Sequence, residues 1–455
     1  MTQLPTSTAV VNSSSDPQRM ANGRWTIVGL LMAQAALLHF NRGALPAAGT
    51  EHLIPEGLIS EAQMGTIYSA LLIVYTFCMI PGGWCIDRFG PRLALLGMGF
   101  GCAAIIPLTG ATALLPASFL FLALCLVRGL LGMFCAPMHP GAARSISFCM
   151  PPQERGLANG LVTCAAVLGA ASTPILFGHL MDWLNWPTAF VVAGLLTALV
   201  TQAWRAGSRG HPVRTPAVAT PDCDADLADG FASVREATAA RSTRANDSRH
   251  LLISLGFLTV AYAAYSYCQY LFFAWSQYYF DKVLELGTGI GRRNSTITLL
   301  GMAVGMVAGG WLADLVPRRV GRFPGMSLVP LAGMVASGVF LLLGVSVKAP
   351  NAVLACFTLS MAALATCESP FWVNGVALGR RRGGLSGAIL NTVGNAGGLV
   401  APIVTPLFSD HIGWRGSLAV AGVICLMGAP LWLMVDPGDD DPGRGRGESV
   451  DGLNP

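Results

Sequence analysis

The chain has 455 residues, of which 53% are hydrophobic and only 11% are charged, and its formal net charge is +4. A soluble domain carries roughly 25% charged residues, so this composition excludes an ordinary soluble protein and favours helices packed in lipid. The 12 cysteines are scattered, mostly inside apolar runs. Without paired spacing they argue against a disulfide framework or a metal centre.

Twelve apolar runs each have the length of about 20 residues that crosses a bilayer. In chain order they cover residues 25–46, 62–86, 93–113, 117–140, 156–181, 185–204, 251–276, 294–315, 324–347, 351–376, 384–408 and 412–435. We therefore predict an all-α membrane protein with two six-helix halves. Its parts are an N-terminal tail at 1–24, a first half at 25–204, a linker at 205–250, a second half at 251–435 and a C-terminal tail at 436–455.

The linker and the basic residues indicate the orientation. Residues 205–250 are rich in Arg, Asp, Thr and Ala, which is typical of a flexible linker, with a short surface helix near 227–240. Of the 28 Lys and Arg residues, 21 fall on the side of both termini and 5 on the other side. The positive-inside rule then predicts that both termini are cytoplasmic in a bacterial-type inner membrane.

Three further expectations concern surroundings and partners. The segment before Trp25 is polar and lacks the apolar stretch of a cleavable signal, so we expect the first span to direct insertion. The basic residues need no nucleic-acid partner because the lipid bilayer explains their distribution. We expect a monomer without a cofactor.

A glycine-rich, charged turn occurs twice in the chain. Residues 82–92 and 309–319 share the pattern Gly-Gly-Trp followed by an aspartate, and the two aspartates are 227 residues apart. Such a repeat indicates two copies of one half, with a transport site between them. We expect an aspartate that caps a helix end and pairs with a nearby arginine. The residues predicted to form this conformational latch are Gly83, Asp87, Arg88, Gly90, Arg92 and Asp314.

Charged residues inside the apolar spans are the strongest functional signal. Arg42 and Arg128 are the only lysine or arginine residues there, apart from Arg415 at the very start of the last span. An arginine at the bilayer centre costs about 3 to 10 kcal/mol or more, so it persists for a reason. Because a guanidinium suits a carboxylate, we predict that both bind an anionic substrate. A structural ion pair remains an alternative for both, and snorkelling to the membrane surface for Arg42.

Glu368 is the one acidic residue within a span, apart from Asp314 at the very end of the span 294–315. It is a candidate proton carrier because burial disfavours the charged carboxylate, and a partner for an arginine is the alternative. His39, three residues before Arg42, and His139 are further titratable candidates, or else interfacial histidines. Aromatic rings and amides that suit a substrate cavity are Tyr75, Tyr270, Trp372, Asn391 and Asn395.

The pattern Gly83-x-x-x-Asp87-Arg88-x-Gly90-x-Arg92 resembles the loop signature of the major facilitator superfamily. The resemblance covers the chain from about Trp25 to Val435. It implies inverted three-helix repeats in each half, a central cavity and alternating access by a rocker-switch motion.

Four local patterns are similar to the anion:cation symporter branch, which includes galactonate, hexuronate, glucarate and phthalate transporters. They are Arg42-x-x-x-Pro46, the segment from Arg128 to Pro137, Trp275-Ser-Gln-Tyr-Tyr, and Asn391-x-x-x-Asn395-x-Gly-Gly-x-x-x-Pro402. Three positions depart from that branch. Asn41 and Cys135 stand where proton-coupled members have acids, and Ala166 stands where they have a glutamine that contacts sugar acids.

We therefore predict a secondary active transporter of a small organic anion, linked to protons through Glu368 or a histidine. The alternatives are an exporter of a carboxylate-bearing metabolite such as a siderophore or of drugs, and an uncoupled facilitator. An enzyme is disfavoured because no nucleophile–base spacing, metal cluster or phosphate loop stands out. A signalling receptor is disfavoured because the linker and tail are too small and polar for an output domain.

Overall fold

The computed structural model describes residues 17–151, 154–209, 237–378 and 383–435, which are almost entirely helical. Short π-helical turns, η1 and η3, follow α1 and α8, and short 3₁₀ turns, η2 and η5, follow α3 and α13. In chain order the elements are α1 (Pro17–Ala48), η1 (Gly49–Leu53), α2 (Glu61–Phe89), α3 (Pro91–Ala111), η2 (Thr112–Leu114), α4 (Ala117–Cys135), α5 (Met138–Cys149), α6 (Arg155–Leu184), α7 (Trp186–Gly207), α8 (Ala237–Tyr278), η3 (Tyr279–Val283), α9 (Thr288–Val320), α10 (Arg322–Ser346), α11 (Pro350–Ala365), α12 (Glu368–Leu378), α13 (Gly383–Gly428) and η5 (Ala429–Met434).

The all-α membrane fold is confirmed, and each predicted span coincides with a helical segment. Ten helical stretches of the described chain are long and apolar enough to cross a membrane. One of them is α13, which turns at Gly413 (φ 71°) and so contains the last two predicted spans. Polar residues near its middle lower the hydropathy of α1, which is not among the ten. The helix α8 begins at Ala237, inside the segment predicted as linker. Most of the surface helix predicted at 227–240 and the C-terminal tail lie outside the described residues.

Left-handed residues terminate helices at matching places in the two halves. Gly90 (φ 81°) ends α2 and Gly321 (φ 99°) ends α9, and each is followed at once by the next helix. Asn185 (φ 67°) separates α6 from α7, and Gly413 lies 228 residues later. Positive φ favours glycine or asparagine, so these residues set the reversals between spans. The recurrence of these turns supports two copies of one structural half.

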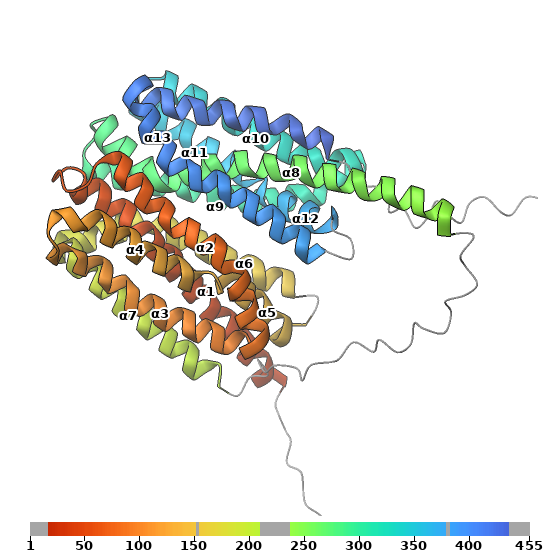
Figure 1. The fold of residues 1–455 in the computed structure, drawn as a ribbon, viewed down its shortest axis with the longest axis horizontal. Helices are drawn as coiled ribbons and strands as arrows, with labels where there is room; N and C mark the ends of the chain where they lie inside the picture. The colour runs from red at the N-terminus through yellow and green to blue at the C-terminus, as the bar shows by residue number, and fades with distance from the viewer. Residues whose placement is uncertain (1–16, 152–153, 210–236, 379–382, 436–455) are drawn as a thin grey trace, which may run out of the picture.

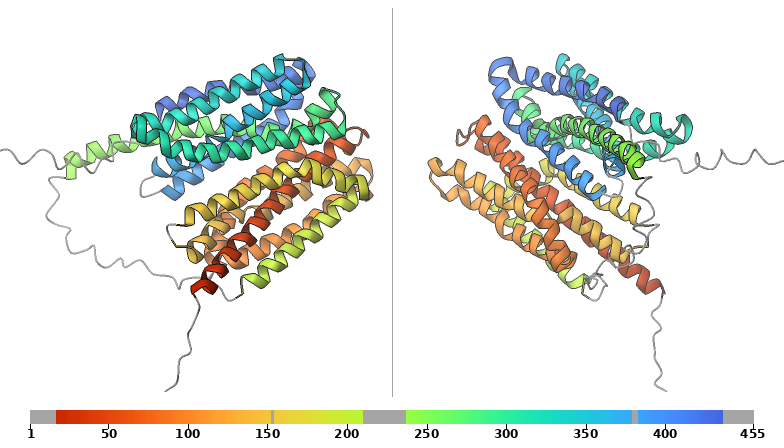
Figure 2. Two further views of the ribbon diagram at one scale, coloured as in Figure 1. Left: turned by 180° about the vertical axis from the view of Figure 1, so that it is seen from behind. Right: turned by 45° about the vertical axis from the view of Figure 1, so that its right-hand side comes forward.

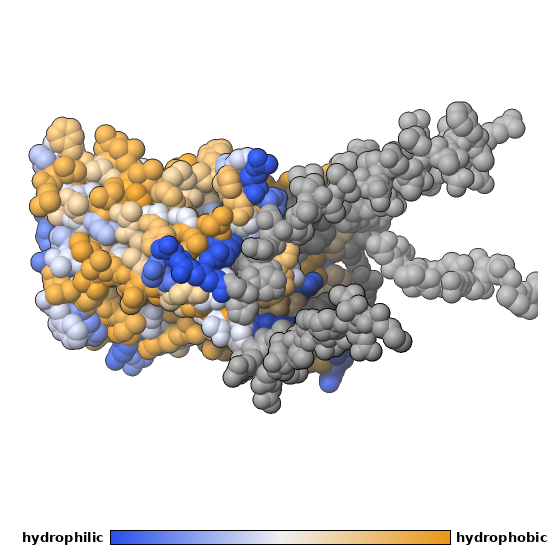
Figure 3. All heavy atoms as spheres, turned by 90° about the horizontal axis from the view of Figure 1, so that it is seen from below, coloured by the Kyte–Doolittle hydropathy of each residue, from blue (hydrophilic) through white to orange (hydrophobic). Residues whose placement is uncertain are grey.

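The two halves are separate helical bundles. Helices α1–α7 supply most of one hydrophobic core, and α8–α13 with η5 supply most of another. Ala274, Trp275 and Tyr278 of α8 pack into the first core, and Val167 of α6 packs into the second. In Figures 1 and 2 the bundles approach each other at the end where α1 is followed by η1 and α2, which we call the closed end. Their ribbons separate toward the end where α7 stops and α8 starts, which we call the linker end. Apolar side chains cover much of the face in Figure 3, as expected for helices that meet lipid.

Candidate functional site

Arg128 on α4 completes the hydrogen bonding of α1. Pro46 lacks an N–H group, so the carbonyl oxygen of Arg42, four residues earlier, has no helical donor. The Arg128 Nη2 atom donates to this oxygen at 2.7 Å, and Nη1 lies 3.5 Å from the carbonyl oxygen of Asn41. Arg128 is 2% exposed, and its buried Nε has no partner in the described part of the chain. It therefore fixes the segment that carries Arg42 while keeping one donor free.

Arg42 lies between the halves. Its Nη2 donates to the hydroxyl of Tyr270 on α8 at 3.3 Å, and its Cζ lies 5.3 Å from the ring centre of Tyr75 on α2. Within the described ranges neither Arg42 nor Arg128 has a carboxylate within the 4.0 Å of an ion pair. The structure thus brings Tyr75 and Tyr270 together around the guanidinium of Arg42, which no acid of the described residues neutralises.

The two histidines lie beside this centre. The rings of His39 on α1 and His139 on α5 are 5.3 Å apart in an edge-to-face arrangement. The Nδ1 atom of His39 also lies 3.0 Å from the carbonyl oxygen of Ala35. His39 is one helical turn before Arg42, so a proton bound by this histidine pair would place a second positive charge close to the guanidinium.

Glu368 forms a second polar centre in the other half. Its Oε1 accepts from the indole N–H of Trp372 at 2.9 Å and from the hydroxyl of Tyr262 at 3.4 Å. Its Oε2 is buried and has no hydrogen-bond partner among the residues described. No lysine, arginine or histidine in those ranges lies within ion-pair distance of it. Neutral donors thus orient this carboxylate without neutralising it.

The helix α13 seats the tyrosines of α8 through two glycines. A Cβ atom at Gly394 would lie 2.1 Å from the ring of Tyr262, and one at Gly398 would lie 2.3 Å from the ring of Tyr270. The predicted amides lie on the same stretch of α13. Asn391 Nδ2 is 2.8 Å from the sulfur of Met79 on α2, and Asn395, 7% exposed, has a buried Nδ2 without a partner in the described chain. The close approach of α8 and α13 therefore depends on Gly394 and Gly398, and less on the polar side chains of Asn391 and Asn395.

A cluster of ion pairs joins the halves at the closed end. The guanidinium of Arg292 on α9 binds both oxygens of Glu51 in η1, at 2.7 and 2.5 Å, and both oxygens of Asp182 on α6, at 2.6 and 2.8 Å. Gln277 on α8 also donates to Glu51, at 2.6 Å. The sequence analysis assigned Arg292 to a loop and missed this cluster. The available signal was a set of acids in the first outer loop facing basic residues in the matching loop of the second half.

Backbone contacts also hold the closed end together. The carbonyl oxygen of Pro402 lacks a helical donor because Pro406 follows four residues later, and the indole N–H of Trp275 donates to it at 3.2 Å. The hydroxyl of Ser69 on α2 donates to the carbonyl of Leu399 at 2.7 Å. At Gly65 on α2 a Cβ would lie 2.1 Å from the Pro402 oxygen. The two halves therefore meet there with backbone against backbone.

The predicted latch lies at the linker end. Asp87 and Arg88 are exposed in the last turn of α2, and neither Arg88 nor Arg92 is within ion-pair distance of Asp87. Instead Arg92 Nε donates to the hydroxyl of Ser208 at 2.9 Å, which ties α3 to the end of α7. Gly90 supplies the positive φ that ends α2. Gly83 faces open space, and the side chain of Asp314 lies outside the described residues.

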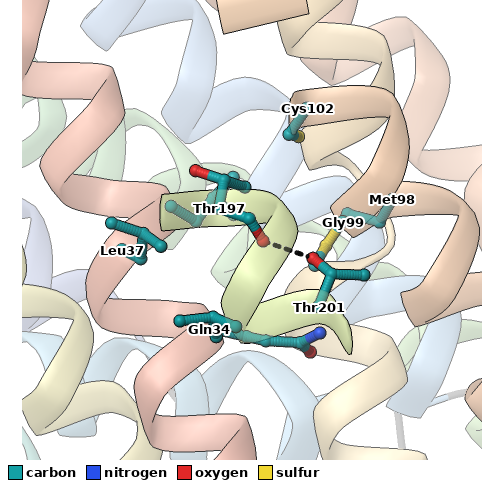
Figure 4. A pocket seen from close by; sticks show the side chains of 9 residues that line it. Gln34, Leu37, Met98, Gly99, Cys102, Thr197 and Thr201 are labelled. Carbon is teal, nitrogen blue, oxygen red and sulfur yellow. Dashed lines mark hydrogen bonds between the residues drawn. The ribbon is translucent and has the colours of Figure 1, made fainter. Parts of the chain in front are cut away.

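One small cavity and one open surface groove lie away from these centres. A cavity of about 10 Å³ between α1, α3 and α7 is lined by Gln34, Thr197 and Thr201, among others (Figure 4). It has room for about one water molecule, and both polar atoms of the Gln34 side chain are buried without a partner in the described chain. A larger space of about 520 Å³ between α6 and α9 is lined by apolar side chains such as Val307 and Trp311. Neither has the basic lining of an anion site.

Comparisons with known proteins agree with the fold. Three relatives match over most of their length. The D-galactonate transporter of Escherichia coli O6:H1 is 25% identical over 90% of this chain and 95% of that protein. The probable sulfoacetate transporter SauU of Cupriavidus necator is 24% identical, covering 91% and 94%. The probable galactarate/D-glucarate transporter GarP of Escherichia coli K12 is 25% identical, covering 94% and 97%.

A solved structure and a family model identify the architecture. The structure of a bacterial homolog of the human lysosomal transporter Spinster, in an inward-facing and unoccupied conformation, has a TM-score of 0.71. It is 16% identical and covers 91% of this chain and 97% of the other. The model of the Major Facilitator Superfamily matches residues 21–389. The chain therefore belongs to the major facilitator superfamily and is a membrane transporter, not an enzyme, as the sequence motifs predicted.

Proposed function

We propose that the protein moves a small organic anion across the cytoplasmic membrane by alternating access, with Arg42 as the main contact for the substrate carboxylate. The observation that carries the proposal is the position of Arg42 between the halves without a carboxylate partner in the described chain. A guanidinium in a medium of low dielectric attracts an anion strongly. The named substrates of the relatives, D-galactonate, sulfoacetate and galactarate or D-glucarate, are organic anions as well.

The contacts of Arg42 also support a binding site shared by both halves. Tyr75 belongs to the first half and Tyr270 to the second, so a ligand on Arg42 meets both. Arg128 acts mainly as a positioning residue through the carbonyl oxygen of Arg42, and its free Nε is a second donor. In this proposal the closed end faces outward, because α1 begins at the linker end and the N-terminus is predicted to be cytoplasmic.

Proton coupling is part of the proposal. The pair of His39 and His139 lies close to Arg42, and Glu368 is the buried acid of the second half. If Glu368 carries the proton, Glu368→Gln will abolish accumulation driven by a pH gradient while exchange of labelled for unlabelled substrate continues. If the histidine pair carries it, His139→Gln will do so. Unchanged accumulation in both variants would favour an uncoupled facilitator.

Direction is tested separately. Uptake into right-side-out vesicles supports import, and uptake into everted vesicles alone supports the alternative of an exporter of a carboxylate-bearing metabolite, a siderophore or a drug.

The anion site is tested by binding to the purified protein. A ligand that binds only the folded protein raises its melting temperature, and the rise increases with the ratio of ligand concentration to dissociation constant, so a screen of organic acids identifies the substrate class. We expect Arg42→Ala to abolish the stabilisation by any acid that stabilises the wild type, with the melting temperature of the free protein unchanged. Arg293→Ala, at an exposed position on α9, is the matched control. Stabilisation that persists in Arg42→Ala would refute the site.

A further inference from the structure

We infer that Glu368 binds the end of the substrate remote from Arg42 and selects monoanions that carry a hydroxyl or amine donor at that end. This inference depends on the proposed anion site. Its first basis is the charge of the two polar centres. Arg42 and Arg128 contribute two positive charges on the first half, and Glu368 contributes one negative charge on the second. With Glu368 ionised the sum is +1, which one carboxylate neutralises.

The second basis is the free oxygen of Glu368. Oε1 already accepts from Trp372 and Tyr262, whereas the buried Oε2 has no donor within 3.5 Å in the described chain, although the hydroxyl of Tyr265 lies near the carboxylate. Burying an acceptor without a hydrogen-bond donor costs free energy, and the cost is larger for a charged carboxylate than for a neutral acceptor. A substrate hydroxyl or ammonium would supply the missing donor. A second substrate carboxylate would instead meet a like charge.

The third basis is how the two centres are linked along α8. Tyr270 contacts Arg42 and Tyr262 contacts Glu368. These tyrosines are eight residues apart, which corresponds to a rise of about 12 Å along the helix. An extended acid of about six carbons, with a hydrogen bond at each end, spans a distance of this order. Gly394 and Gly398 of α13 hold both rings against the same neighbouring helix, so the two contacts belong to one surface.

The chemistry of this surface gives Glu368 a defined role. One end of the substrate is a carboxylate at Arg42, and the other end is a donor at Oε2. A site built to hydrogen-bond a substrate donor rejects an analogue without it strongly, because the buried acceptor is then left unpaired. Repulsion between like charges adds to this rejection. Glu368 therefore acts on selectivity at the distal end of the substrate.

Two acids that differ only at the distal end test this role. D-Galactonate ends in a hydroxymethyl group and galactarate in a second carboxylate. Their dissociation constants are measured by calorimetry on the purified full-length protein, without a proton gradient, for the wild type and Glu368→Gln. Glutamine keeps an oxygen acceptor for Trp372 and Tyr262 and removes the charge. We expect the wild type to prefer galactonate and the variant to lose about tenfold or more of that preference.

Three outcomes would overturn the inference. They are an unchanged ratio in Glu368→Gln, a wild-type preference for galactarate, and the absence of binding of both acids to both proteins. If Glu368→Gln loses gradient-driven accumulation but keeps the wild-type ratio of the two dissociation constants, Glu368 is a proton carrier only. Arg42→Ala separates the two proposals. If it still binds both acids, the proposed anion site fails. If it loses both while the ratio is unaffected by Glu368→Gln, only the selectivity role fails.

Discussion

The ion-pair cluster at the closed end yields the sharpest prediction, which concerns Arg292→Gln. The side chain of Glu51 is 4% exposed and that of Asp182 is 49% exposed. Water therefore screens the Asp182 pair, and the loss at Glu51 dominates. Removing one partner of a buried ion pair costs about 3–5 kcal/mol. Gln277 still donates to Glu51, so we expect the closed conformation to lose about 3 kcal/mol of stability relative to the open one. This loss lowers the ratio of closed to open molecules about a hundredfold.

This shift is measured as a distance between spin labels across the closed end. One label replaces Glu56 after η1 and the other replaces Ile290 at the start of α9, both at exposed positions, in a protein without its native cysteines. The wild type should show one short distance. Arg292→Gln should add a population at longer distance, because the open outer end gains relative to the closed one.

Arg293→Gln is the matched control. Arg293 is the next residue in α9 but is exposed, and its Nε contacts the side chain of Asn294 at 3.4 Å. We expect it to keep the wild-type distance distribution. Identical distributions in Arg292→Gln and wild type, in protein that melts at the same temperature, would show that the cluster does not hold the closed end.

Three further predictions follow from other contacts. Gly65→Ala forces a methyl group against the Pro402 oxygen and should slow transport by preventing closure. Gly97→Ala on α3 meets nothing within 4 Å and should leave transport unchanged, and equal rates in the two variants would contradict the close approach. Tyr270→Phe removes the hydrogen bond to Arg42, which contributes about 1 kcal/mol, so the dissociation constant of the anion, measured by calorimetry, should change about fivefold at most while the protein stays folded. A complete loss of binding would mean that the hydroxyl contacts the substrate itself. Tags at both termini should be inaccessible to impermeant reagents in intact cells, and labelling of either would contradict the predicted orientation.

The fold could be predicted from the sequence because hydropathy acts locally. A bilayer requires long apolar helices, so the spans are visible residue by residue. The reversals were visible for a similar reason, since Gly90 supplies a backbone conformation that other residues avoid. Boundaries were less accurate where polar residues continue a helix, as in α8, which starts well before its apolar part.

The site was only partly predictable. Arg42, Tyr75 and Tyr270 were expected to line one site and do meet. The sequence analysis gave Arg128 the same role as Arg42, but its main contact is the carbonyl oxygen left free by Pro46. That role needs α4 to lie against α1, which no local pattern encodes.

The sequence by itself determined that the chain is a membrane protein with two related halves and with charges inside its spans, because composition, periodicity and repeat spacing are properties of the chain. The tertiary structure alone decided which charges pair. Arg292 lies next to a second arginine in the chain, yet it is buried between two acids that are 110 and 241 residues away, while Arg293 faces outward. The energy of an ion pair depends on distance and burial, and packing of the two halves sets both.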